Sequence, residues 1–434
     1  MKQIPKNFQA IFSLMYKTLD KCRLCSGPFF QKTLKLKETP PANELYPTRE
    51  QARAADKFPL EVVMCSECKH VQLKHIVSPE RLFDDYIYKS GTSSFFKQHF
   101  NKLAEQIVSK FLITSYVLEV GSNDGILLRS LENREVKSIG VEPSIFLANE
   151  CISSNQIVYN SYFNQQIVSE ILKTHGTASI VVGNNVFAHI EDLNEAFKNV
   201  AKVLNPTGMF IFEVAHFKYI YTIGIFDTIY HEHMSYHTAF SMEKFAKNFG
   251  FKIVNIEEIP SHGGSLRFFL SKDQNMIVDP SVNEIIKDEV VLGLNSEKAL
   301  ELIEEKIKLI KLSVSKIIEN LLSNEGMKFF GYGAPAKVVT FLAQMDLENL
   351  DLIGVIDDNL SKQGKYLPGS GFKVSSVEEV KQNLMGSNKI NTISSTCLIF
   401  PWNLKSEILK KLKEWAPTNS NAVLFFPTVE KVDI

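Results

Sequence analysis

The sequence predicts an α/β protein whose central part folds as a doubly wound parallel sheet, between a small metal-binding domain and a second strand–turn–helix domain. Three observations predict this arrangement. Apolar strand-like and helix-like pieces alternate from about residue 110 to residue 270, two C-x-x-C pairs precede them, and the alternation resumes after residue 326. Such alternation is typical of parallel sheets whose strands are joined by helices.

Length and charge limit the class of protein. A chain of 434 residues is expected to hold about two to four domains, and its net charge of −1 provides no cationic field for a nucleic-acid backbone. The first residues lack the apolar core of a signal peptide, and no segment has the roughly 18 continuous apolar residues of a membrane span. We therefore expect a cytoplasmic protein with no nucleic acid and no membrane as partner, in which cysteines serve something other than disulfides.

Four of the six cysteines form two pairs, Cys22 with Cys25 and Cys65 with Cys68. Each pair can present two thiolates to one metal ion, and two pairs complete a tetrahedral zinc site. Thirty-nine residues separate the pairs, so the spacer is expected to hold a strand or two and a loop. Because four thiolates close the coordination sphere, we predict a structural zinc, and catalysis or nucleic-acid binding by the knuckles as alternatives.

The turn after the first strand of the central domain, "EVGSNDG", has the features of a nucleotide-binding loop. Gly121 and Gly125 permit a turn in which backbone N–H groups approach a ligand. Glu142 ends the next predicted strand, 21 residues after Gly121, where an acid accepts hydrogen bonds from ribose hydroxyls. The predicted ligand therefore contains a ribose.

The same loop discriminates between cofactors. A dinucleotide fingerprint has a second glycine where Asn123 stands here, and the acids Glu119 and Asp124 would repel a phosphate. S-adenosylmethionine carries an ammonium and a sulfonium and no phosphate, and this loop with a strand-end acid is the usual pattern of class I methyltransferases. We predict S-adenosylmethionine, with NAD or a tight turn of an unrelated sheet as alternatives. The predicted cofactor-binding residues are Glu119, Gly121, Ser122, Asn123, Asp124, Gly125, Glu142 and Asn184.

The densest polar cluster, "YHEHMSYHT", follows the predicted strand "GMFIFEV". It holds Tyr230, His231, Glu232, His233, Tyr236 and His237. An imidazole can accept a carbon-bound proton near neutral pH, and a tyrosine hydroxyl can donate to a developing enolate oxygen. We predict general acid–base chemistry here. The alternatives are a second metal at the H-x-H spacing and histidines that only fill a loop.

Two further segments are expected at the same edge of the sheet. Asn185 and His189 follow a strand whose carboxyl end should lie over the cofactor. In "SHGGSLR", the backbone around His262 and Gly263 could form an anion-binding nest, with Arg267 as a phosphate clamp. A plain turn between strands is an equal alternative for this second segment.

The C-terminal part begins with a predicted helix over residues 296–322, whose apolar positions repeat every three or four residues. This seam packs a core or, alternatively, a dimer interface. The segment "KFFGYGAPAKVVTFL" is then a strand, a Gly-rich turn and a helix, the same order of elements as in the central domain. It lacks some glycines of the dinucleotide-binding motif. We predict a Rossmann-like domain that holds a substrate, with Lys337 as a phosphate partner and a separate NAD site as an alternative.

Together these motifs resemble the S-adenosylmethionine-dependent C-methyltransferases of nucleotide-deoxysugar biosynthesis. The resemblance runs along nearly the whole chain, from the double C-x-x-C and "YIYKSGTSS" through "VLEVGSNDG", "GVEPS", "YHEHMSYHT" and "HGGSLR" to "GYGAPAKVVTFL" and "DDNLSKQGKYLPG". It implies a zinc-binding domain, a class I methyltransferase domain and a C-terminal Rossmann-like domain, with the sugar bound between domains. The corresponding boundaries are 1–80, 81–275, a helical connector over 276–325, and 326–434.

The resemblance also implies the substrate and the site residues. The substrate is a nucleotide-linked 4-keto-deoxysugar, carried on dTDP or GDP and methylated at the carbon next to the keto group, typically C3. His233 is implied as the base. The other implied catalytic residues are Tyr230, Glu232, Asn185, His189 and one of Tyr86 and Tyr88. His237 departs from the family pattern, in which an aromatic residue is common.

The residues agree with this chemistry, because the keto group acidifies the neighbouring C–H and the resulting enolate attacks the methyl donor without a covalent nucleophile. Other readings stay open at this stage. They are methylation of a hydroxyl, methylation of another keto substrate, and a zinc-containing binding module without catalysis. The chain is expected to act as a monomer or a homodimer.

Overall fold

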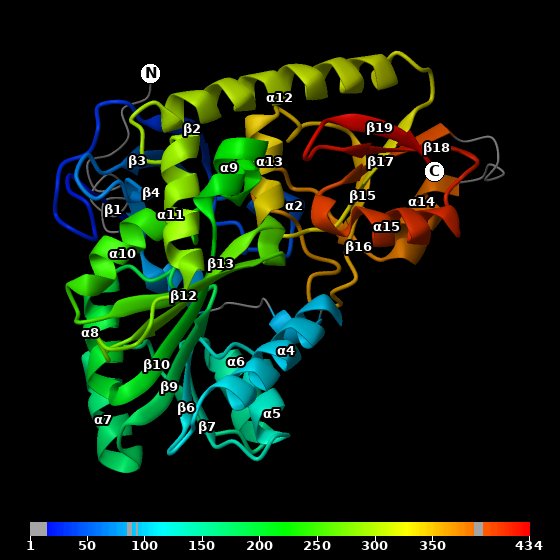
Figure 1. The fold of residues 1–434 in the computed structure, drawn as a ribbon. Helices are drawn as coiled ribbons and strands as arrows, with labels where there is room; N and C mark the ends of the chain where they lie inside the picture. The colour runs from blue at the N-terminus through cyan, green and yellow to red at the C-terminus, as the bar shows by residue number, and fades with distance from the viewer. Residues whose placement is uncertain (1–14, 85–88, 93, 386–393) are drawn as a thin grey trace. The chain divides into compact units, whose positions relative to one another are not determined.

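A computed structural model describes residues 15–84, 89–92, 94–385 and 394–434 (Figure 1). The chain forms two compact units of interleaved segments. The first unit comprises the chain up to Gln31, Val63–Lys218 and His233–Glu297. The second comprises Lys32–Val62, Tyr219–Glu232 and Lys298–Ile434. The spacer between the two cysteine pairs therefore belongs mainly to the unit that contains the C-terminal half of the chain.

A seven-stranded sheet forms the first unit, in the order β12-β13-β10-β9-β6-β7-β8. The pairs from β10 to β8 are parallel, and only β13 runs opposite to its neighbours. The predicted parallel sheet is therefore confirmed with one reversed strand. The strands are β6 (Val117–Val120), β7 (Ser138–Glu142), β8 (Val158–Asn160), β9 (Ala178–Asn184), β10 (Leu204–Ala215), β12 (Lys252–Ile259) and β13 (Ser265–Ser271).

Helices cover both faces of this sheet, since an apolar strand pattern on each face needs a partner (Figure 1). One core joins the sheet to α4 (Ser94–Lys110) and α5 (Ile126–Glu132). The other joins it to α7 (Gln165–His175), α8 (Leu193–Val203) and α10 (Ala239–Lys247). The remaining helices are α6 (Ile145–Ser153), α9 (Phe217–Ile223, which continues into the second unit) and α11 (Pro280–Leu292), with a 3-10 turn at Ser261–Gly263.

Short elements surround the cysteine pairs in the first unit. Strand β1 (Tyr16–Thr18) pairs with β5 (His75–Val77), and β4 (Val71–Leu73) pairs with β11 (Ser235–Tyr236), both antiparallel. Helix α3 (Pro79–Phe83) and a 3-10 turn at Ser90–Thr92 follow. The pairing of β4 with β11 links the segment after the second cysteine pair to Ser235 and Tyr236, shortly after His233.

The second unit contains a six-stranded sheet in the order β16-β15-β14-β17-β18-β19, parallel except for β19. Numbered from β14, this is the 3-2-1-4-5-6 order of dinucleotide-binding folds, so the predicted Rossmann-like topology is present. The strands are β14 (Lys328–Tyr332), β15 (Leu352–Ile356), β16 (Val374–Ser375), β17 (Ser394–Ile399), β18 (Asn419–Leu424) and β19 (Glu430–Asp433). The helices are α12 (Ala299–Leu322), α13 (Lys337–Gln344), α14 (Val377–Met385) and α15 (Lys405–Lys413), with 3-10 turns at Phe226–Thr228 and Trp402–Leu404.

Inserted segments complete the second unit. Strand β2 (Leu34–Thr39) pairs with β3 (Phe58–Met64), and α2 (Arg49–Arg53) lies between them in sequence. Phe226 stacks on Phe341 of α13, and the hydroxyl of Thr340 donates to the carbonyl of Ile229. The predicted long helix is α12, whose buried residues recur mostly every three or four positions as expected, while Ile310 within the same run is only partly buried.

Candidate active site

The four paired cysteines form the metal site. The Sγ atoms of Cys22 and Cys68 lie 3.6 Å apart, those of Cys25 and Cys65 lie 3.4 Å apart, and all four lie within 4.8 Å of one another. A tetrahedron with zinc–sulfur bonds of about 2.3 Å has edges of about 3.8 Å, so this cluster fits a four-thiolate zinc ion. The separations also exclude disulfide bonds between these sulfurs. The predicted zinc ligands are therefore brought together as expected.

Backbone amides support three of the sulfurs. The N–H groups of Leu24, Gly27 and Glu67 point at Cys22, Cys25 and Cys65, each at 3.4 Å. Such bonds favour the thiolate form that binds a metal. A Cβ at Gly27 would lie 2.8 Å from the Glu67 carboxylate and 3.2 Å from the sulfur of Cys25, so the two knuckles approach closely here.

The cofactor loop turns where the sequence predicted. Gly121 and Gly125 adopt φ values of 68° and 70°. A Cβ at Gly121 would lie 2.9 Å from Val186, and one at Gly125 would lie 2.2 Å from Gln156. Glu142 accepts from the backbone N–H of Asn123 at 2.8 Å and of Ser144 at 2.9 Å, so it fixes the loop from the end of β7.

Three buried acids face this loop. Burial raises the pKa of Glu119 well above its ordinary value, and the nearby carboxylates raise it further, while Asn184 acts in the opposite direction. Burial also raises the pKa of Asp124, and that of Glu142 to about 7. One carboxylate oxygen each of Glu119 and Asp124, and the hydroxyl of Ser122, have no hydrogen-bond partner among the described residues. This acceptor set fits the ammonium and ribose hydroxyls of S-adenosylmethionine.

A second segment meets the loop, and the sequence did not predict it as part of the cofactor site. The N–H of Ser90 donates to the side chain of Asn123 at 2.9 Å, and the N–H of Gly91 donates to Asp124 at 3.0 Å. A Cβ on Gly91 would lie 2.3 Å from that carboxylate. The signal in the sequence was the glycine of "YKSG", which makes the close approach possible.

His189 and His233 lie together, as predicted from their segments. Their rings stack with centroids 5.1 Å apart and planes inclined by 24°, and Phe83 stacks on His189 at 5.7 Å. Burial lowers the pKa of His189 to about 4, so this imidazole is neutral at physiological pH. Asn185, in a left-handed conformation with φ of 57°, donates its N–H to the Glu213 carbonyl at 2.7 Å.

The neighbouring predicted residues lie in the second unit. Glu232 is buried, and one of its carboxylate oxygens accepts from the backbone and side-chain nitrogens of Asn43 at 3.2 and 3.1 Å. Burial raises the pKa of Glu232 to about 7. Tyr230 is partly buried. Tyr86 and Tyr88 fall outside the described residues.

In the "SHGGSLR" segment, the partner of Arg267 differs from the predicted phosphate. His262 has a left-handed conformation, with φ of 51°, beside Gly263, and its ring packs against Phe96 at 5.2 Å. Arg267 is buried and donates to Glu213 through Nε at 3.2 Å and Nη2 at 2.8 Å. Its guanidinium is therefore committed to an internal ion pair, a partner that the sequence did not indicate.

Glu213 is the centre of this buried network. Burial alone would raise its pKa, but His99, Arg267 and Ser261 outweigh that effect and lower the pKa of Glu213 to about 2. His99 lies 3.1 Å from the same carboxylate. The network joins α4 to the carboxyl end of β10.

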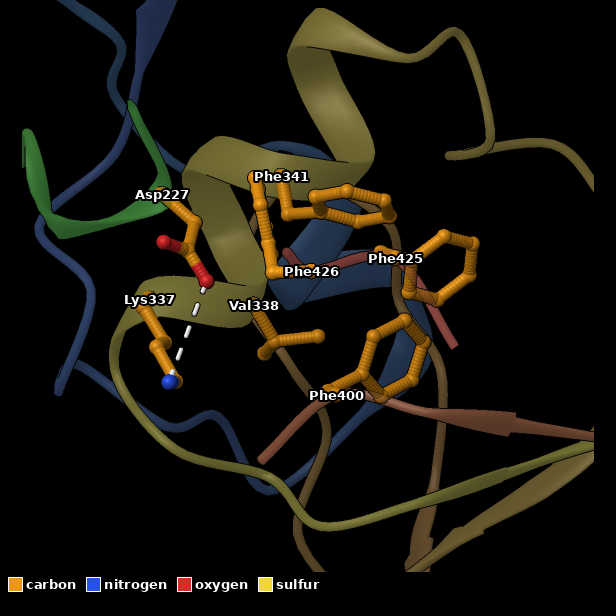
Figure 2. A pocket seen from close by; sticks show the side chains of 7 residues that line it. All are labelled: Asp227, Lys337, Val338, Phe341, Phe400, Phe425 and Phe426. Carbon is orange, nitrogen blue, oxygen red and sulfur yellow. Dashed lines mark ion pairs between the residues drawn. The ribbon is translucent and has the colours of Figure 1, made fainter. Parts of the chain in front are cut away.

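Lys337 begins α13 in the second unit. Its ammonium lies 3.9 Å from Asp227 and 4.8 Å from the centre of the Trp402 ring. Figure 2 shows the two charged side chains facing each other beside a wall of Val338 and four phenylalanines. Burial raises the pKa of Asp227 to about 6 and lowers that of Lys337. The phosphate role of Lys337 stays a prediction.

The Gly-rich turn of the second sheet holds its own strand-end acid. Asp357 accepts from the N–H of Ala334 at 2.8 Å, and Lys362 donates to the Ala334 carbonyl at the same distance. A Cβ on Gly333 would lie 2.4 Å from Pro401, so the turn packs against protein. Asp357 therefore holds its turn in the way that Glu142 holds the cofactor loop.

Comparison with known proteins agrees with this geometry. Three family models match in order: a zinc binding domain at residues 22–83, a methyltransferase domain at 92–256, and a C-methyltransferase C-terminal domain at 260–427. The C-methyltransferase NovU of Streptomyces niveus is 28% identical over 414 residues, which cover 95% of this chain and 96% of the relative.

Solved structures resemble only part of the chain. Magnesium protoporphyrin IX methyltransferase from Synechocystis PCC 6803, solved with S-adenosylmethionine, is 14% identical over 40% of this chain and 78% of its own, with a TM-score of 0.32. The CcbJ methyltransferase of Streptomyces caelestis is 11% identical over 40% of this chain and 88% of its own, with a TM-score of 0.33.

Among the described helices, none is long and apolar enough to cross a bilayer.

The order of the domains, the four-cysteine cluster and the acid-lined cofactor loop lead to one assignment. The chain is thus an S-adenosylmethionine-dependent C-methyltransferase with matches, in order, to a zinc-binding domain, a methyltransferase domain and a C-methyltransferase C-terminal domain.

Proposed function

We propose that this enzyme methylates the carbon next to the keto group of a nucleotide-linked 4-keto-deoxysugar, at C3. The observation that carries the proposal is the stack of His189 on His233 near the carboxyl ends of β9 and β10. In a doubly wound sheet this edge is where ligands bind. A substrate with an acidified C–H uses an imidazole base and needs no covalent nucleophile.

The roles follow from the chemistry of each group. S-adenosylmethionine, when bound, supplies a methyl group activated by its cationic sulfur. His233 accepts the proton from the carbon next to the ketone, and the electron pair of that C–H bond moves into the enolate. Tyr230 donates a hydrogen bond to the enolate oxygen, with Tyr86 or Tyr88 as a second donor. His189 stays neutral, so it adds no repulsion when His233 becomes charged.

The remaining groups hold the substrate. Glu232, buried and held by Asn43, accepts from a sugar hydroxyl. The backbone at His262 and Gly263 holds the diphosphate of a dTDP- or GDP-linked sugar. The cysteines are not paired in disulfides, which suits a reducing compartment and supports a cytoplasmic enzyme.

A two-stage assay tests the proposal. In heavy water without cofactor, the enzyme should exchange the C3 hydrogen of a dTDP- or GDP-linked 4-keto-6-deoxyhexose. With S-adenosylmethionine labelled in its methyl carbon, NMR of the product should then place the label on C3. A label on an oxygen or on another ring carbon, or labelling without any prior exchange, contradicts the proposal.

A further inference from the structure

Arg23 lies between the zinc ligands Cys22 and Cys25, and its guanidinium reaches two segments far away in sequence. Nη1 donates to the carbonyls of Ile190 at 2.9 Å and Glu191 at 2.8 Å. Nη2 donates to the carbonyl of Met234 at 2.7 Å and to the hydroxyl of Ser235. One planar fork thus serves four acceptors.

These acceptors directly follow the stacked histidines. Ile190 and Glu191 come next after His189, and Met234 and Ser235 come next after His233. The same two segments also meet where the N–H of Ser235 donates to the Ala188 carbonyl at 3.1 Å. Because the guanidinium is rigid and planar, its two ends fix the spacing of the segments in a way that a single ammonium cannot.

Arg23 is itself held at the backbone. Its N–H donates to the Gln72 side chain at 2.9 Å, and its carbonyl accepts from Asn194 at 2.6 Å. Gln72 lies opposite Ser235 in the pairing of β4 with β11. Cys22 directly before Arg23 and Cys25 two residues after it are the predicted zinc ligands, so a zinc ion bound there would hold the residue on both sides.

We propose that Arg23 is a positioning residue through which the zinc-bound knuckle sets the geometry of the His189–His233 pair. On this proposal, zinc contributes to methyl transfer indirectly, because it orders the segment from Cys22 to Cys25 that positions Arg23. This inference rests on the proposed role of His233 as the base. It gives the zinc domain a task in the reaction beyond holding its own fold.

Arg23→Lys and Arg23→Ala test the proposal in the full-length zinc enzyme, with dTDP-4-keto-6-deoxyglucose as the probe. We expect stoichiometric zinc and an unchanged dissociation constant for S-adenosylmethionine, but a kcat lowered about tenfold to hundredfold. Hydrogen exchange next to the ketone in heavy water, without cofactor, should slow by the same factor. Millimolar guanidinium should restore part of the rate of Arg23→Ala.

Arg134→Lys is the matched control. Arg134 also donates to a backbone carbonyl and to an asparagine, but it lies just after α5. Normal kcat in Arg23→Lys with zinc bound would overturn the proposal. So would a loss that guanidinium does not restore and that affects cofactor binding as strongly as turnover.

His233→Asn, assayed beside these variants, separates this inference from the proposed function. An inactive His233→Asn with a fully active Arg23→Lys overturns only the role of Arg23. A fully active His233→Asn overturns the base assignment and, with it, the geometry that Arg23 is said to set.

Discussion

The imidazole of His189 stacks on two rings, with its centroid 5.7 Å from that of Phe83 and 5.1 Å from that of His233. Burial keeps His189 neutral, with its pKa lowered to about 4. A neutral, immobilised ring beside the candidate base fixes the orientation of that base without opposing its protonation. The two segments that carry His189 and His233 therefore act together to orient the candidate base.

Replacing His233 should therefore affect chemistry and leave cofactor binding intact. We expect His233→Asn to lower kcat by about 10²–10⁴-fold, the usual contribution of a general base. Calorimetry should give an unchanged affinity for S-adenosylmethionine. His175→Asn is the control, because His175 ends α7 and contacts Tyr159. Loss of cofactor binding in His233→Asn would contradict the assignment.

Cofactor affinity should depend on pH through Glu142. Burial raises its pKa to about 7, so below that pH the free enzyme holds the carboxyl protonated. A cationic ligand favours the carboxylate, so affinity should rise as pH increases through about 7, with release of a proton. Calorimetry in buffers of different ionisation enthalpy measures that release.

Glu142→Gln should flatten this pH dependence and weaken binding, while Glu170→Gln on the exposed face of α7 should not. The amino group of the ligand titrates equally with each protein, so the difference between variants isolates Glu142. An identical pH profile in wild type and Glu142→Gln would show that another group is responsible.

Local patterns predicted the parts of the fold that local rules determine. The cysteine spacing, the turn at Gly121 and Gly125, and the acid at Glu142 each follow from chemistry that a few neighbouring residues satisfy. The parallel, doubly wound type of the central sheet and the Rossmann-like type of the second domain followed from the alternation of strands and helices. The reversed strand β13 was not evident, because its apolar pattern is the same in either direction.

Long-range pairing could not be predicted. Arg23 lies inside a C-x-x-C pair, and nothing near it in sequence indicates that it binds carbonyls 167 to 211 residues away. The local sequence "SHGGSLR" suggests that Arg267 is a phosphate clamp. Its actual partner, Glu213, lies 54 residues earlier, so the local sequence does not reveal the ion pair. The assignment of Lys32–Val62 to the second unit likewise depends on contacts with α13, such as that of Gln344 with Lys37.

Zinc removal should unfold the knuckles. We expect Cys65→Ser to lose the metal and to lower the melting temperature, because binding of a structural zinc ion contributes free energy directly to folding. Metal content and thermal melting measure both effects. Cys397→Ala is the control, since Cys397 lies buried in β17 and should leave zinc content unchanged. Full zinc in Cys65→Ser would contradict the four-cysteine site.

Glu213 should be essential for stability, and its loss should show what Arg267 does. Glu213→Gln removes the nearer of the two carboxylates that pair with buried Arg267, the other being Glu257 at 3.5 Å, and breaking a buried ion pair costs about 3–5 kcal/mol. Glu258→Gln, which breaks a more exposed pair with Lys218, should cost at most about 1 kcal/mol. Urea unfolding of the two variants measures the contrast.

The buried network around Glu213 should also determine how far the stability of the folded enzyme falls at acid pH. The pKa of Glu213 is lowered in the folded state to about 2, so its stabilising effect is complete above its ordinary value and is lost as pH falls toward 2. Wild-type stability should fall over that window, and Glu213→Gln should show a smaller slope. If Arg267→Lys instead keeps wild-type stability and raises only KM for a nucleotide-sugar, then Arg267 binds phosphate and the internal pair is secondary.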